Sequence, residues 1–141
     1  MTRLAIWALI ALFVINLYTG LIKGWGENVW FNIAFHFLGG FFVAMLIYSF
    51  YHNEFSKLSQ PLLRFLIVAA MTIAVGAVWE FAEYVGNKTL AQPIYDAFQY
   101  HIYFMGDLDD TIQDLSMDAI GAFAFLALLG LTRLSRKAQE Y

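Results

Sequence analysis

The sequence predicts an all-α integral membrane protein, an antiparallel four-helix bundle that forms a single transmembrane domain over residues 1–141. Of these residues 61% are hydrophobic and 18% aromatic, and only 13% are charged. That charged fraction is about half the value of ordinary soluble domains. Four runs are also apolar enough to cross a bilayer, which requires about 20 residues. The predicted spans are residues 4–22, 29–51, 62–83 and 111–131.

The composition also excludes some kinds of function. The chain has no cysteine, so disulfides and thiolate metal sites are excluded. The net charge of −3 is small and no basic tract occurs, so nucleic acid is not an expected partner. Membrane lipids are the expected partners, and a homo-oligomer is left open.

The first span follows Arg3 and could be mistaken for a signal peptide. Its apolar run exceeds the usual core of about 7–15 residues, and no convincing small-x-small cleavage site follows, so we expect a retained helix. A short polar loop, HNEFSKLSQP, separates the second and third spans, and Pro61 marks the start of the third.

A segment over residues 89–106 separates the third and fourth spans and is too short and polar to cross the membrane. Its apolar residues Ile94, Phe98 and Ile102 recur at helical spacing, which predicts a short helix lying in the membrane interface. This segment is either a connecting loop with aromatic anchors or a lid over the outer end of the bundle.

The positions of lysine and arginine predict the orientation, because these residues accumulate on the cytoplasmic side. Six of them fall on one side of the four-span topology and two, Lys23 and Lys88, on the other. Both termini are therefore expected in the cytoplasm, with residues 23–28 and 86–110 facing outward. The six on the cytoplasmic side are Arg3, Lys57, Arg64, Arg133, Arg136 and Lys137.

Every span carries one polar stripe. The stripes consist of Asn16, Thr19 and Lys23; of Asn28, Asn32 and His36; of Glu80 and Glu83; and of Asp110, Asp114 and Asp118. At a rise of 1.5 Å per residue, His36 and Asp118 lie roughly 9–10 Å below the outer ends of their helices, and Glu80 and Asp114 roughly 5 Å. The stripes therefore meet in the outer third of the membrane. Glycines beside them, Gly39, Gly40, Gly76 and Gly121, are expected to permit close helix packing.

This concentration of acids predicts a cation site. A carboxylate in hydrocarbon costs about 2.5–3.5 kcal/mol on insertion scales, and neighbouring carboxylates cannot all ionise without a cation or shared protons. An oxygen-rich site with one imidazole suits a divalent ion such as Mg, Mn, Ca, Fe or Zn. The predicted metal ligands are His36, Glu80, Asp107, Asp114 and Asp118, and the predicted catalytic residues are Glu83 and Asp110, one of them as general base.

Each of these residues also has a structural interpretation. Asp110 and Gln113 fit a helix N-capping box, and Asp107 and Asp109 could be solvated loop residues. Glu83 could lie at the level of the lipid headgroups, and His36 could be an interhelical hydrogen-bonding group.

Three segments together carry a family resemblance: HFLGG at His36–Gly40, WEFAE at Trp79–Glu83, and the aspartate-rich stretch Gly106–Ala122. In these the chain resembles the YjdF-like bacterial inner-membrane proteins and, more distantly, VanZ-like membrane proteins. The resemblance implies a multi-pass protein of the bacterial inner (cytoplasmic) membrane and no particular activity.

Three functions are consistent with the sequence. The first is a metal-dependent membrane enzyme, a hydrolase acting on a lipid or other amphipathic substrate at the outer leaflet. The second is a protein that handles or transports cations or protons. The third is a structural or assembly protein in which the polar residues lock the helices together.

Overall fold

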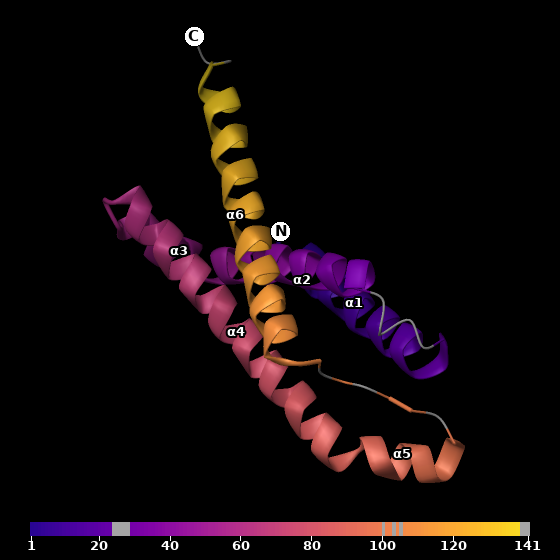
Figure 1. Cartoon of the computed structure of the whole chain (residues 1–141). Helices are drawn as coiled ribbons and strands as arrows, with labels where there is room; N and C mark the ends of the chain where they lie inside the picture. Colours follow the sequence, from indigo (N-terminus) through magenta and orange to yellow (C-terminus); the bar gives the residue numbers. More distant parts are fainter. Residues whose placement is uncertain (24–28, 100, 103, 105, 139–141) are drawn as a thin grey trace.

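The structure is a computed structural model that describes residues 1–23, 29–99, 101, 102, 104 and 106–138. Every regular element in these ranges is an α-helix (Figure 1). The helices are α1 (Thr2–Lys23), α2 (Val29–Phe50), α3 (His52–Lys57), α4 (Pro61–Thr89), α5 (Ala91–Phe98) and α6 (Leu108–Ala138). The predicted outer loop with Asn28 lies outside the described residues, as do the side chains of Lys23, Arg133, Arg136 and Lys137.

The all-α prediction is confirmed, and α1, α2, α4 and α6 are the four helices long and apolar enough to cross a membrane. Two helices extend past their predicted ends: α4 continues to Thr89 and α6 begins at Leu108. Two short helices lie outside the spans. One is α3, in the predicted cytoplasmic loop, and the other is α5, within the segment predicted to contain a short helix. The antiparallel bundle remains a prediction.

The contacts between helices show which parts of α2, α4 and α6 lie side by side. Along α2 and α6 the contacts advance in the same direction, from Asn32 beside Asp114 to Tyr48 beside Phe125. Along α4 and α6 they advance in opposite directions, since Gly76 lies against Asp118 whereas Phe65 stacks on Phe123 at 4.8 Å. The beginnings of α2 and α6 therefore meet the C-terminal half of α4.

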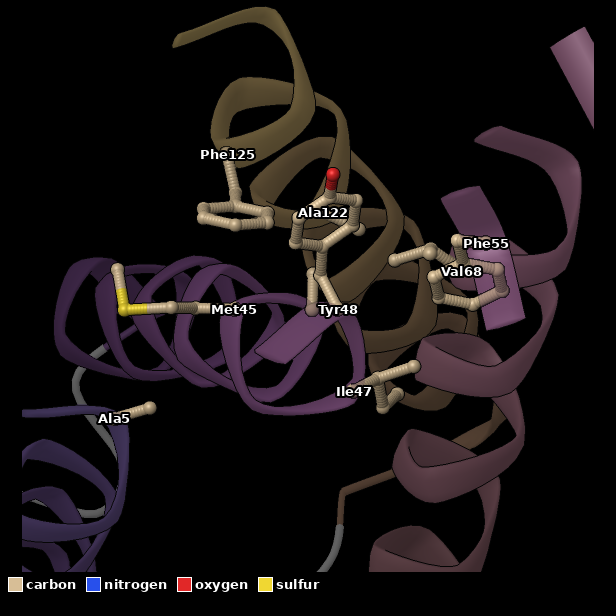
Figure 2. Packing of buried hydrophobic residues seen from close by; sticks show 9 residues of the cluster. Ala5, Met45, Ile47, Tyr48, Phe55, Val68, Ala122 and Phe125 are labelled. Atoms are coloured by element: carbon tan, nitrogen blue, oxygen red, sulfur yellow. The ribbon is translucent and has the colours of Figure 1, made fainter. Parts of the chain in front are cut away.

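An apolar core fills the other half of the helix assembly (Figure 2). Tyr48 of α2 is central to it, because its ring stacks on Phe55 of α3 at 5.9 Å and meets Phe125 of α6 edge to face at 6.1 Å. The remaining buried members of the core are Ala5, Ala44, Met45, Ile47, Val68 and Ala122. This half of the molecule buries aromatic and aliphatic side chains, whose removal from solvent stabilises the packing.

Glycines let α2 and α6 approach closely, and this pair makes the most extensive contact between helices. A Cβ atom on Gly121 would meet the backbone of Phe37 and Phe41, and one on Gly40 would meet the backbone of Asp118. The prediction of close packing is thus confirmed at Gly40 and Gly121. It is not required at Gly39, where an added Cβ would lie at an ordinary distance of 3.9 Å from Asp118 Oδ1.

Described residues between α5 and α6 contact the end of α4. The backbone N–H of Phe104 donates to Oδ1 of Asn87 at 2.7 Å, and the Phe104 ring packs on Gly86. Ile102 is buried as well. These contacts attach the described part of the segment to α4, beside the polar site.

Candidate metal centre

Three predicted ligands from three helices converge at one point: His36 of α2, Glu80 of α4 and Asp114 of α6. One potential ligand atom from each lies within 4.8 Å of the other two. Nε2 of His36 is 3.4 Å from Oδ2 of Asp114 and 3.9 Å from Oε1 of Glu80. All three residues are buried, with exposed fractions of 7%, 6% and 1% for His36, Glu80 and Asp114.

Asn32 positions the aspartates of α6. It lies one turn before His36 on α2, so that both side chains face the same neighbour. Its amide Nδ2 donates to Asp114 Oδ1 at 2.8 Å and Oδ2 at 2.9 Å, and to Asp110 Oδ1 at 3.3 Å. An amide N–H bound to both oxygens fixes the orientation of the Asp114 carboxylate.

Asp118 lies on the opposite edge of the imidazole from the other two acids. Its Oδ1 is 3.5 Å from Nδ1 of His36. A carboxylate at one ring nitrogen commonly orients a metal-binding histidine and selects the tautomer that leaves the other nitrogen for the metal. Asp118 therefore suits the role of a supporting residue behind His36.

Glu80 lacks the partners that the other two ligands have. Both of its carboxylate oxygens are buried and make no hydrogen bond of ordinary geometry, although the buried Thr111 hydroxyl lies close enough to interact with the carboxylate. Among the described side chains, the only ion pair of a lysine or arginine is Lys57–Glu54 on the exposed surface of α3. The protein thus supplies no lysine or arginine to this buried carboxylate within that part of the chain.

Asp107 does not join the group. It is exposed, and its Oδ1 accepts the backbone N–H of Asp110 at 3.1 Å at the start of α6, which is the hydrogen bond of a helix N-cap. Asp110 in turn accepts the N–H of Gly106 through Oδ2 at 3.1 Å. The predicted capping box of Asp110 and Gln113 is wrong by one turn, because α6 begins at Leu108. Asp109 is exposed.

Comparison with known proteins identifies the family. Residues 1–136 match the family described as a predicted membrane protein, DUF2238. The chain belongs to the DUF2238 family. No curated protein and no solved structure matches it. The family match confirms that the chain is a membrane protein. The resemblance to YjdF-like and VanZ-like proteins and the bacterial origin remain predictions.

The residues of this DUF2238 protein fit a divalent metal ion in their spacing. Two ligands of one ion at about 2.0–2.2 Å can lie at most about 4.4 Å apart. The two distances from His36 Nε2, 3.4 Å to Asp114 and 3.9 Å to Glu80, are within that limit, and all three ligand atoms lie within 4.8 Å of one another. One imidazole and two carboxylates suit zinc, manganese or iron. Three protein ligands also leave coordination positions for water or substrate, as in catalytic zinc sites.

Two cavities adjoin the candidate metal site of the DUF2238 protein. The smaller chamber, about 140 Å³, includes His36 and Asp118 in its wall, with Leu9, Val43 and Thr72 farther along the helices. The larger chamber, about 320 Å³, includes Asn32 and Glu83. The predicted catalytic residue Glu83 therefore faces a cavity, and its Oε1 accepts a hydrogen bond from Trp79 Nε1 at 2.7 Å. Trp79 was not among the site residues predicted from the sequence. Its spacing of four residues from Glu83, one helical turn, was the available signal.

Proposed function

We propose that this DUF2238 protein binds one divalent metal ion through His36, Glu80 and Asp114, and that the metal serves the hydrolysis of a lipid or other amphipathic substrate. The observation that carries the proposal is the Glu80 carboxylate. It is 6% exposed, its oxygens make no hydrogen bond of ordinary geometry, with only the Thr111 hydroxyl close by, and it faces His36 and Asp114. An unpartnered buried carboxylate is costly, and a bound cation removes that cost.

The residues around the three ligands have separate roles in the proposed reaction. Asp118 holds the imidazole from its Nδ1 side. Asp110 shares the Asn32 amide with the ligand Asp114, which makes it the better placed general base of the two predicted catalytic residues. Glu83 lines the larger chamber and would contact the substrate. A bound metal would polarise an ester or phosphoryl oxygen and lower the pKa of a water molecule, whose proton the base accepts.

The apolar core favours hydrolysis over transport. Beyond the metal centre, Tyr48, Val68 and Phe125 belong to a buried hydrophobic cluster that joins α2, α4 and α6. None of the buried members of that cluster lines either chamber, so the described cavities do not extend through it.

The proposal includes the predicted topology, with four helices crossing the membrane in alternating directions and both termini in the cytoplasm.

Metal analysis of the detergent-purified protein tests the binding. We expect one divalent ion per chain by mass spectrometry, and its loss in Glu80→Gln and Asp114→Asn. Two exposed residues provide matched controls: Glu54→Gln on α3 and Asp109→Asn at the start of α6 should retain the metal. If no preparation retains metal after loading with Mn, Zn, Mg or Ca, the proposed metal centre is refuted.

A second assay tests the hydrolysis. Metal-loaded protein is incorporated into vesicles that contain lipids with fluorogenic ester or phosphodiester groups, and release of the dye is followed. We expect turnover that stops with a chelator and falls in Asp110→Asn while the metal content remains. A protein that retains its metal and cleaves neither group would restrict the metal to a structural role.

A further inference from the structure

The two chambers beside the metal centre have a common wall. Phe13 and Asn16 of α1, Phe35 of α2 and Trp79 of α4 line both of them. The rings of Phe13 and Trp79 meet edge to face at 6.1 Å. The larger chamber lies toward the C-terminal end of α4, and the smaller one toward the middle of the helices. The two chambers therefore adjoin each other, and a molecule with two different ends would reach both of them past these side chains.

Aromatic rings and one carboxylate dominate the larger chamber. Among the lining residues that the structure describes, Glu83 is the only acid and none is a lysine or arginine. The amides of Asn16 and Asn32 are its other strongly polar groups. Its aromatic lining residues are Phe13, Phe31, Phe35, Trp79 and Phe104. Aromatic faces attract organic cations, and cages of such rings recognise quaternary ammonium groups.

The position of Glu83 strengthens the preference for a cation. Glu83 lies one helical turn from Glu80 on the same face of α4, so each carboxylate raises the cost of the other's charge. The Trp79 indole N–H holds Oε1 of Glu83 against the chamber wall. The indole face is also the best of the natural aromatic surfaces for a cation. A positive ligand in the larger chamber would meet both groups together.

The smaller chamber provides a site for the apolar part of such a ligand. Leu9, Leu12, Val43 and Val75 line it together with Phe13. It lies deeper along the spanning helices than the larger chamber does. A head group in the larger chamber and a hydrocarbon tail in the smaller one would thus follow the orientation of an amphipathic molecule in a bilayer leaflet.

We infer that the two chambers bind an amphipathic ammonium compound from the membrane, with its cationic head between Glu83 and the aromatic rings and its tail in the smaller chamber. A volume of about 320 Å³ for the larger chamber is at the lower end of the range of about 300–1,000 Å³ for small-molecule sites. It suits one head group. The inference does not depend on the metal, since Glu83 is not among the three ligands.

Calorimetric titration of the purified protein tests the head-group preference directly. The protein is kept in a non-ionic detergent and treated with a chelator, so that the result does not depend on metal binding. The probes are hexyltrimethylammonium, choline, and 3,3-dimethylbutan-1-ol, which is the neutral carbon analogue of choline. We expect choline to bind at least about tenfold more tightly than its neutral analogue, and the hexyl compound more tightly than choline.

Variants test the position of the site. Glu83→Gln and Trp79→Leu should each weaken hexyltrimethylammonium binding by about tenfold or more. Glu54→Gln and Trp7→Leu, at exposed positions on α3 and α1, should bind as the wild type does. Equal binding of choline and its neutral analogue would overturn the inference, and so would unchanged binding in Glu83→Gln. Absence of binding by every probe to the wild type would also overturn it, without bearing on the metal analysis.

Discussion

Replacing Gly121 with alanine tests whether α2 and α6 are as close as the structure places them. The added Cβ would lie 2.8 Å from the backbone nitrogen of Phe41 and would also meet the carbonyl of Phe37. An ordinary contact begins at 3.4 Å. Because these neighbours are backbone atoms, a side-chain rotation cannot relieve the overlap, and the two helices must separate.

The expected cost follows from the kind of overlap. Additional methyl groups in a well-packed interior typically cost about 1–3 kcal/mol, and an overlap with backbone should reach the upper part of that range. Gly130 provides the matched control on the same helix, since nothing lies within 4 Å of a Cβ placed there. Gly130→Ala should leave stability unchanged or raise it by up to about 1 kcal/mol, because glycine weakens a helix interior.

Reversible unfolding in mixed micelles measures both changes in the free energy of unfolding. Gly121→Ala should also weaken metal binding, because α2 carries His36 and α6 carries Asp114, and such a site tolerates displacements of only about 0.5 Å. A Gly121→Ala protein as stable as the Gly130→Ala protein, with its metal retained, would refute the described distance between α2 and α6.

Three further predictions concern the site, the helix end and the topology. Asn32→Ala should reduce metal affinity about 10–100-fold in a metal titration, because Asn32 orients the Asp114 carboxylate; an unchanged affinity would exclude that role. Asp107→Ala should lower the free energy of unfolding by about 0.5–2 kcal/mol through loss of the N-cap of α6, whereas Asp109→Ala should change it by less than about 0.5 kcal/mol. Since the chain has no cysteine, Ser56→Cys and Gln92→Cys each introduce a single thiol; in intact cells an impermeant maleimide should label only position 92, and the reverse result would invert the topology.

The residues that converge could be predicted from the sequence because the depth of a residue in the membrane depends mainly on its distance along its helix from the membrane surface. Helices with the same rise, crossing in alternating directions, bring residues at equal depth to the same level. His36, Glu80 and Asp114 lie at similar depths by this measure, and in the structure they converge. The comparison of depths requires only the ends of the spans, which the long apolar runs provide.

The sides on which the residues meet could not be predicted in the same way. Asp114 and Asp118 share one face of α6, yet they lie at opposite edges of the His36 ring. That distinction depends on the rotation of α6 against α2, which the backbone contacts at Gly40 and Gly121 determine. No local pattern encodes a rotation of this kind.

The start of α6 and the two chambers were also beyond sequence reasoning. Aspartates at positions 107, 109 and 110 all suit a helix N-cap, so composition alone cannot select Asp107. The shape of the chambers depends on the position of α1 relative to α2 and α4, which includes the contact between Phe13 and Trp79. Such space between helices leaves no motif in the chain.

The distribution of the three proposed metal ligands over α2, α4 and α6 has a consequence for biogenesis. Spans are made in order, so His36 and Glu80 enter the membrane before Asp114 has been synthesised. Until α6 inserts, the ionised Glu80 carboxylate carries the insertion cost of about 2.5–3.5 kcal/mol. An incomplete chain therefore retains a costly polar group in its third span until α6 is in place. Metal uptake would mark the moment at which synthesis and insertion are finished.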